Sequence, residues 1–238
     1  MISSGVDSKQ IRSRILNTIE NGLQFDLSTD HCDRFLRRHI NKKLKLVVLY
    51  VDIHDSTKMS LSIPETNFAL IIQIFSQEVG LVIRGYGGYI LKYVGDAVIA
   101  IFPAEFDNYK ACENAINCAR SILCIINECI NPVFKVYRLP EITVKIGLEY
   151  GNALVVLYGK SLQMAHVDLI GQCMGITAKI TAVAQSNEIV IGQSIYSIFL
   201  SYDYDSNNDA ILKSFQLSCE SMSKYIDKSE SVSVAAFV

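Results

Sequence analysis

Apolar residues in this chain gather into short runs and periodic stretches, and these predict both strands and helices. The sequence Leu-Val-Val-Leu-Tyr-Val at residues 46–51 is a continuous apolar run of strand length, typical of a central strand covered on both faces. Two β-branched and aromatic runs at residues 89–102 flank a Val94-Gly95-Asp96 corner. Glycine supplies the backbone freedom that a tight turn requires, so this stretch predicts a hairpin with a carboxylate at its tip.

Further strands are predicted in the second half of the chain. Residues 141–150 alternate apolar and polar side chains with period two, and the apolar run at 153–158 follows directly after Gly151-Asn152. This order predicts that 153–158 is the hairpin partner of 141–150. Short apolar stretches at 188–191 and 231–238 complete the predicted strands.

Apolar residues that recur every three or four positions predict helices between these strands. Asp7 as a capping residue and Pro64 in a first turn mark two of the predicted helix starts. The helix that begins near residue 107 is long, and Pro132 and Pro140 are expected to bracket a loop after it. The predicted helices cover approximately residues 7–21, 28–43, 62–85, 107–130, 171–184 and 194–200.

The order strand, helix, strand, strand, helix, strand is the split pattern of a ferredoxin-like (βαββαβ) sheet, so we predict an α+β fold with extra C-terminal elements. The character of the chain changes near Leu44, which divides it into an N-terminal helical appendage at residues 1–44 and a main domain at 45–238. The second N-terminal helix carries a basic face, which is most often solvated; a regulatory partner is the alternative. Its members are Arg34, Arg37, Arg38, Lys42 and Lys43.

Composition narrows the functional classes. Half of the 238 residues are hydrophobic, 19% are charged and the mean hydropathy is +0.26, which favours burial of surface against a second copy of the chain. The net charge of −2 gives no electrostatic reason to expect nucleic acid or an anionic membrane as a partner. No apolar run approaches the roughly 20 residues that span a bilayer. Seven cysteines without zinc-like spacing are interpreted as reduced core residues, so we expect a cytoplasmic location.

The predicted topology suggests two aspartates as candidate metal ligands. Asp52 stops the first strand and Asp96 lies at the tip of the hairpin. If the first strand and the hairpin are neighbours, both carboxylates point into the same space. Two carboxylates beside a backbone carbonyl, such as that of Ile53, suit Mg²⁺. Asp52 alone would be interpreted as a solvated carboxylate at a strand end.

Four motifs occur in one order along the chain. They are Asp-Ile-His-Asp-Ser-Thr at 52–57, Lys-Tyr-Val-Gly-Asp at 92–96, Ile-Gly-Leu-Glu-Tyr-Gly at 146–151 and Asp-Leu-Ile-Gly at 168–171. Together they resemble the class III adenylate/guanylate cyclase catalytic domain, over about residues 45–192. The resemblance implies a head-to-tail homodimer with active sites at the interface, where one subunit gives the metal aspartates and the other gives base recognition.

The resemblance also implies an activity: an adenylate cyclase that converts ATP to 3′,5′-cyclic AMP and pyrophosphate. Two Mg²⁺ or Mn²⁺ ions would bind Asp52, Ile53 and Asp96. Lys92 stands at the family's base-reading position, and Asp168 aligns with its partner there, across from the subunit that supplies the metal aspartates. A carboxylate and an ammonium complement the N6 amino group and N1 of adenine, which favours ATP over GTP. Taken singly, Lys92 is more often solvated and Asp168 more often a turn residue.

The chain departs from the family pattern in the helix after Asp168. The family has Asn to orient the ribose and Arg to stabilise the phosphates, and this chain has Gly175 and Lys179 there. Lysine keeps the charge of arginine but lacks its fork. A phosphate-binding lysine is also expected before the last strand, and Lys228 is the nearest candidate. The alternatives are a degenerate cyclase-fold module that binds nucleotide or dimerises without turnover and, less favoured, a guanylate cyclase.

Overall fold

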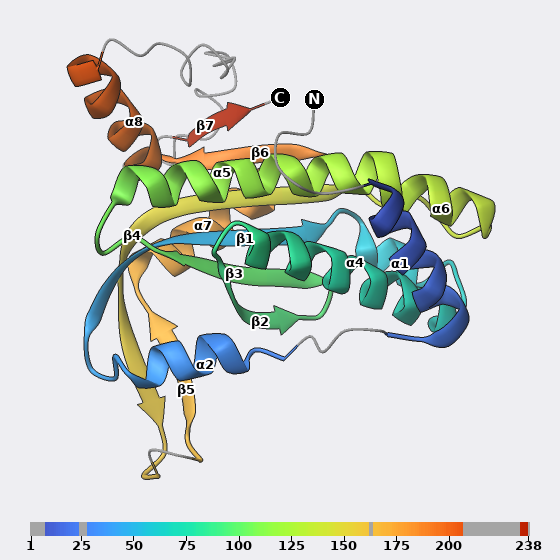
Figure 1. Cartoon of the computed structure of the whole chain (residues 1–238), viewed down its shortest axis with the longest axis horizontal. Coiled ribbons are helices and arrows are strands. Elements are labelled where there is room, and N and C mark those ends of the chain that lie inside the picture. The colour runs from blue at the N-terminus through green and yellow to red at the C-terminus, as the bar shows by residue number, and fades with distance from the viewer. Residues whose placement is uncertain (1–7, 24–27, 162–163, 207–233, 238) are drawn as a thin grey trace.

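The computed structural model describes residues 8–23, 28–161, 164–206 and 234–237 and has one central sheet covered by helices (Figure 1). The sheet has seven strands in the order β2-β3-β1-β4-β6-β7, with β5 also paired to β4. All pairs are antiparallel except β4 with β6. The predicted α+β class is confirmed. The strands are β1 (Lys43–Ile53), β2 (Tyr89–Val94), β3 (Ala97–Pro103), β4 (Val144–Tyr158), β5 (His166–Ile170), β6 (Glu188–Gly192) and β7 (Val234–Phe237).

Strand β1 is the centre of the sheet, as the apolar run predicted. It pairs with β3 along residues 46–52 and with β4 along residues 43–53. Successive side chains of a strand point to opposite faces, and both faces of β1 are buried here. Val47, Leu49 and Val51 lie in one hydrophobic cluster, whereas Leu46 and Val48 lie in another. The strand is longer than predicted, so Asp52 lies within it rather than after its end.

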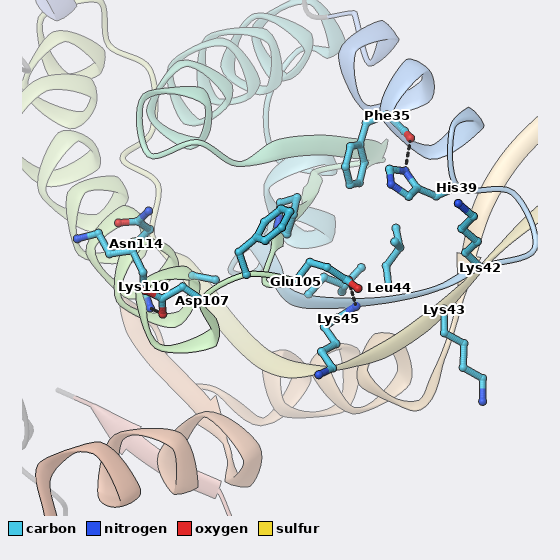
Figure 2. A pocket seen from close by; sticks show the side chains of 14 residues that line it. Phe35, His39, Lys42, Lys43, Leu44, Lys45, Glu105, Asp107, Lys110 and Asn114 are labelled. Atoms are coloured by element: carbon cyan, nitrogen blue, oxygen red, sulfur yellow. Dashed lines mark hydrogen bonds between the residues drawn. The ribbon is translucent and has the colours of Figure 1, made fainter. Parts of the chain in front are cut away.

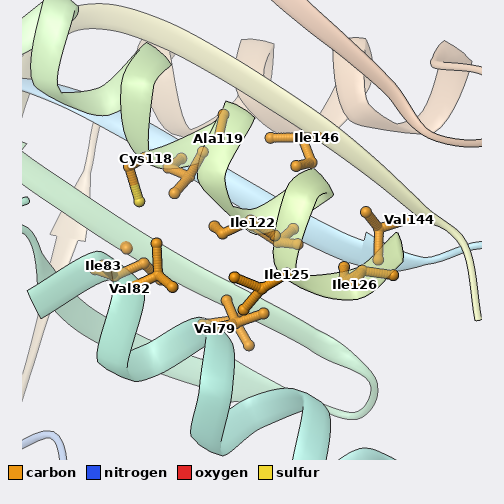
Figure 3. Packing of buried hydrophobic residues seen from close by; sticks show 14 of the residues in the cluster. Val79, Val82, Ile83, Cys118, Ala119, Ile122, Ile125, Ile126, Val144 and Ile146 are labelled. Carbon is orange, nitrogen blue, oxygen red and sulfur yellow. The ribbon is translucent and has the colours of Figure 1, made fainter. Parts of the chain in front are cut away.

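The larger cluster lies under helices on one face of the sheet. Figure 3 shows Val79 and Ile83 of α4 facing Cys118 and Ile122 of α5, with Ile146 of β4 on the far side of α5 from α4 in this view. All five side chains are buried, which supplies the main hydrophobic stabilisation of the domain. The helical elements that contribute residues to this cluster are α1 (Ser8–Asn21), α4 (Glu65–Gly85), α5 (Asn108–Ile125), the π-helix η1 (Ile126–Ile130), α6 (Asn131–Val136) and α8 (Gln193–Ser206).

Two helical expectations are corrected. The predicted long helix continues through η1 into α6, so Pro132 lies in a first helical turn rather than in a loop. Proline is tolerated there because the first-turn N–H groups lack intrahelical partners anyway. Helix α8 reaches Ser206, so the polar stretch from Tyr202 begins as helix.

Helix α4 is a core element joined to the N-terminal helix. By length and composition it is apolar enough to cross a membrane, contrary to the sequence expectation, although 56% of its most apolar window is buried inside the domain. Core helices pass the same test. Its Glu78 is fully buried and forms an ion pair with Arg14 of α1 at 2.5 Å, and Gln77 donates to the Thr18 hydroxyl at 3.0 Å. Polar contacts therefore attach α1 to the domain.

The second face of the sheet carries α2 (Asp30–Arg37) and α7 (Gln172–Val183), while the short α3 (Ser56–Ser60) follows β1. Glycines of β4 let α7 approach closely. A Cβ atom at Gly147 would stand 2.1 Å from the Thr181 hydroxyl oxygen, and one at Gly151 would stand 2.8 Å from the Cβ of Cys173. Helix α7 therefore packs against strand backbone.

The hairpin predicted at Gly151-Asn152 is wrong. Strand β4 runs without a break through these residues, pairs with β1 along its first eleven residues and then extends as a curved arm (Figure 1). Gly151 serves the close approach of α7 instead of a turn. The turn comes later, at Gly159 with φ of +136°, and β5 is the true hairpin partner.

We predict that Gly147→Ala destabilises the domain. The added methyl group meets the Thr181 hydroxyl and its backbone nitrogen, so overpacking is expected to cost about 1–3 kcal/mol of unfolding free energy. Denaturant unfolding measures this loss. Gly175→Ala is the matched control because its Cβ meets nothing within 4 Å, and removing a helical glycine stabilises by about 0.5–1 kcal/mol. Equal effects of the two substitutions would contradict the packing described here.

Candidate active site

The pairing of β1 with β3 brings Asp52 and Asp96 together. Asp52 stands opposite Ala97 on β3, and Asp96 immediately precedes Ala97 in the turn where Gly95 has φ of +61°. Burial of Asp52 and a carboxyl–carboxyl hydrogen bond with the nearby, negatively charged Asp96 raise the pKa of Asp52 to about 6. The topology argument from the sequence therefore predicted this juxtaposition correctly.

The residues after Asp52 extend the site into a loop. Ile53 ends β1 with a buried side chain, so its backbone carbonyl is the atom it can offer a cation. His54 donates its backbone N–H to the Thr143 carbonyl at 2.8 Å. Asp55 has φ of +57°, in the left-handed region that favours glycine, the residue the family often has here. Aspartate tolerates this conformation better than most residues do, which explains why Asp55 can occupy a position that favours glycine.

The donor set fits a magnesium or manganese ion. Two carboxylates and a carbonyl are hard oxygen ligands, and Mg²⁺ in nucleotide enzymes usually binds one or two carboxylates together with substrate phosphates. The described residues contain no group of three or more His, Cys, Asp or Glu side chains placed to hold a metal. The Asp52–Asp96 pair is therefore the candidate metal site among the residues that the structure describes.

Lys92 and Asp168 also meet, although 76 positions separate them in the chain. The Lys92 ammonium on β2 donates to the Asp168 carboxylate on β5 at 2.5 Å, and both side chains are partly buried. The other Asp168 oxygen accepts the Leu169 backbone N–H at 2.9 Å, which fixes the carboxylate. His166 lies 3.9 Å from the same carboxylate. The two predicted base-reading residues thus form one cluster within a single chain.

An irregularity in β2 explains how Lys92 reaches this position. The pairing of β2 with β3 shifts register between Ile90 and Lys92, which marks a bulge. Ile90 and Tyr93 both pack in the larger hydrophobic cluster although they are three positions apart, an odd spacing that would place them on opposite faces of a regular strand. Lys92, adjacent to Tyr93, therefore points away from that cluster. Bulges re-aim side chains in this way, and no local pattern in the sequence predicts this one.

Tyr50 is a neighbour of the base-reading pair that the sequence analysis missed. It precedes Asp52 by two positions, so both point to the same face of β1. Burial and the negative charge of Asp168 raise the pKa of its phenol, with a smaller contribution from Cys173 of α7. The sequence signal for Tyr50 is its spacing, because a residue two positions before Asp52 lies on the same face of the strand.

Gly175 and Lys179 both lie on the exposed face of α7, one turn apart. Open space surrounds Gly175, whereas Thr177, a conceivable substitute for the missing asparagine, is buried and donates its hydroxyl to the Cys173 carbonyl at 2.6 Å. The C-terminal part of α7 lies near the Asp52 end of β1, because Lys145, the β4 partner of Asp52, donates to the Ala182 carbonyl at 3.2 Å. Lys228 lies outside the described residues.

Comparison with known proteins decides the family. A family model described as the adenylate and guanylate cyclase catalytic domain matches residues 39–226. The chain belongs to this family. The resemblance seen in the four sequence motifs is thereby confirmed, and with it the class of nucleotidyl cyclases.

The chain is similar to cyclases that are named for different substrates. A cytidylate cyclase of Staphylococcus aureus is 26% identical over 212 residues, which are 82% of this chain and 48% of that protein. Human adenylate cyclase type 10 is 23% identical over 166 residues, 64% of this chain and 10% of that protein. The crystal structure of the adenylyl cyclase CyaB from P. aeruginosa matches with a TM-score of 0.68 at 18% identity, covering 83% of this chain and 95% of that one. The chain spans less than half the length of the curated relatives it matches.

We predict that Asp52→Asn stabilises the metal-free cyclase at pH 7.5. The substitution removes a half-buried charge held beside Asp96, and a gain of about 1 kcal/mol, or about 2–4 °C in Tm, is expected. Because the folded-state pKa of Asp52 is raised, its ionised form lowers stability as pH rises from the unfolded value near 4 through about 6. The stability gained by Asp52→Asn is therefore expected to be lost at pH 4, where Asp52 of the folded wild type is protonated.

Thermal unfolding in a metal chelator at both pH values measures this difference. Asp55→Asn is the matched control, because Asp55 is exposed and asparagine tolerates its left-handed backbone. A stabilisation by Asp52→Asn that persists at pH 4 would show that charge repulsion is not its cause.

Proposed function

We propose that this cyclase converts a nucleoside triphosphate with an amino-bearing base, ATP or CTP, to the 3′,5′-cyclic monophosphate and pyrophosphate. The observation that carries the proposal is the Lys92–Asp168 pair, a cationic donor and an anionic acceptor 2.5 Å apart. Adenine presents an N6 amino donor beside the N1 acceptor, and cytosine presents an N4 amino donor beside the N3 acceptor. Guanine and uracil present the reverse order and would meet mispaired groups.

This pattern of base recognition accepts more substrates than the ATP that was expected from the sequence. The donor and acceptor pattern separates amino bases from oxo bases but does not separate ATP from CTP. Relatives named cytidylate cyclase and adenylate cyclase support the same pair of substrates.

Each remaining residue has a role in the proposed reaction. The ribose 3′-oxygen attacks the α-phosphorus, the bond to the β-phosphate oxygen breaks, and pyrophosphate leaves. Asp52, Asp96 and the Ile53 carbonyl would hold Mg²⁺ or Mn²⁺, which would lower the pKa of the 3′-hydroxyl and neutralise phosphate charge. Lys179 offers a positive charge to the phosphates. Asp52 and Asp96 of one protomer act with Lys92 and Asp168 of its partner in a head-to-tail homodimer.

A second candidate function is nucleotide binding without turnover. It is favoured by Gly175, which has no side chain to orient a ribose, and by the single ammonium of Lys179 in place of a guanidinium. The loss of one transition-state donor typically costs about 10²–10³ in rate. A slow enzyme and a binding module differ in whether any cyclic product forms.

The test incubates the full chain with each of the four triphosphates and Mn²⁺ or Mg²⁺, and measures cyclic product. We expect product from ATP or CTP, and a ten- to hundredfold lower kcat/KM for Asp168→Asn because the carboxylate acceptor is lost. Asp55→Asn is the matched control and is expected to retain activity. A preference for GTP or UTP would refute the proposed base recognition, and binding without product would favour the module.

The composite site makes a separate prediction. Asp96→Ala removes a metal ligand and Lys92→Met removes a base-reading group, so each variant alone is expected to be inactive. An equal mixture forms heterodimers in half of the cases, each with one intact site of two, and about a quarter of wild-type activity is expected to return. Mixtures that remain inactive while both variants stay folded and dimeric would place all catalytic groups within one chain.

The departure at Gly175 is testable by restoring the family residue. Gly175→Asn is expected to raise kcat, because it supplies a ribose-orienting amide in open space and leaves the fold intact. Gly175→Ala separates this effect from a general gain in helix stability. Equal activities of the two variants would mean that position 175 does not contact the ribose.

A further inference from the structure

Two nitrogen groups from different strands converge on one carboxylate oxygen of Asp168. The Oδ2 atom accepts the Lys92 ammonium at 2.5 Å, and the Nε2 atom of His166 lies 3.9 Å from the same oxygen. His166 and Asp168 are two positions apart on β5, so both side chains point to one face of that strand. The imidazole is therefore a neighbour of the carboxylate assigned to base recognition, and the roles proposed so far do not use it.

The His166 ring is held by a contact across the arm rather than by the core. Tyr158 of β4 is its cross-strand partner, and the two rings stack at a centroid distance of 6.2 Å and an interplanar angle of 27°. Such pairs restrict the orientation of both rings. The His166 side chain is 71% exposed, so burial in the core does not explain its place beside Asp168.

Helix α2 fixes the two strands that carry these groups. The Arg37 guanidinium donates to the carbonyl of Ala165, the residue before His166, at 2.7 Å. Phe35 stacks on Tyr89, the first residue of β2, at a centroid distance of 4.9 Å. Figure 2 shows the end of the helix, where the His39 ring donates to the Phe35 carbonyl at 2.8 Å. One helix therefore holds the strand of the lysine and the strand of the histidine.

The hydrogen bonds of Asp168 leave a place for a further donor when a base binds. Its Oδ1 atom accepts the Leu169 N–H at 2.9 Å, and a carboxylate oxygen can accept two hydrogen bonds. In the free chain Lys92 occupies Oδ2, and 3.9 Å is too long for a hydrogen bond from His166. Base recognition draws the ammonium toward the ring nitrogen of the base, while the amino group of the base donates to Oδ2. A small rotation then brings the imidazole to the second acceptor position of that oxygen.

We propose that His166 is a positioning residue for base recognition, which donates its Nε2–H to Asp168 once Lys92 has turned to the base. This inference rests on the proposed function, because it assigns a further residue to the same site. His166 gains a hydrogen bond in the substrate complex that it lacks in the free chain, so it strengthens binding. It acts through Asp168 and does not touch the reacting phosphate, so it lowers KM and leaves kcat unchanged.

Equilibrium dialysis of the full chain with Mg²⁺ and 3′-deoxy-ATP or 3′-deoxy-CTP tests binding without turnover, because both analogues lack the attacking hydroxyl. We expect His166→Leu to weaken binding about five- to tenfold, since a hydrogen bond to a charged acceptor is lost. His166→Gln keeps an N–H donor and is expected to restore most of this binding. His31→Leu is the matched control, because His31 is an exposed histidine of α2 whose Nδ1 accepts from Arg34 at 3.3 Å.

Turnover of ATP and CTP supplies the second readout: His166→Leu is expected to raise KM by the same factor without a change in kcat. In an Asp168→Ala background it is expected to cause no further loss, because the two residues act as a unit. Losses that multiply, or equal losses in His166→Leu and His166→Gln, would overturn the inference. If Asp168→Ala weakens binding and His166→Leu does not, base recognition stands and the role of His166 falls. Binding that Asp168→Ala leaves unchanged would overturn the proposed base recognition and this inference with it.

Discussion

The pairing of β1 along both of its edges is the constraint on which the rest of the structure depends. Hydrogen bonding to β3 on one side and β4 on the other fixes the register of every residue from Lys43 to Ile53. A slip of one residue would exchange the two faces of the strand and move Val47, Leu49 and Val51 into the smaller cluster, where Leu46 and Val48 now pack. The same register sets Asp52 beside the Asp96 turn and opposite Lys145, so core packing and site geometry are determined together.

The close contact of α7 with β4 is the second requirement. Gly147 and Gly151 remove the side chains that would hold the helix away, and Thr177 and Thr181 fill the space with hydroxyls bonded within the helix. This packing leaves Gly175 and Lys179 on the outer surface of α7. The two departures from the family pattern therefore stand where a second chain can reach them, and neither is required by the fold of one chain.

Much of this architecture could be predicted from the sequence because it is encoded locally. The apolar run of β1, the Gly95 turn and the period of α7 each carry a physical signal within a few residues, and the Asp52–Asp96 pair followed from them. The break assigned at Gly151 was wrong because a glycine needed for close packing has the same local signature as a turn glycine. The β2 bulge and the position of Tyr50 depend on contacts between distant segments, which no local pattern contains. The sequence argument favoured ATP over GTP and did not consider CTP; it carries no signal that separates the two amino bases, because adenine and cytosine present the same pair of groups.

If Lys92 and Asp168 read the base as proposed, their contact sets an energetic threshold for any base that enters between them. In the free chain each group already satisfies the other in a partly buried position. A base with a complementary donor and acceptor replaces both halves of that contact, whereas a base with the reversed pattern separates two charges and leaves each one desolvated and unpaired. Discrimination then arises from rejection of the wrong base as much as from attraction of the right one. A tighter resting pair raises this threshold equally for every base, so it lowers the affinity for all of them and leaves the discrimination between them unchanged.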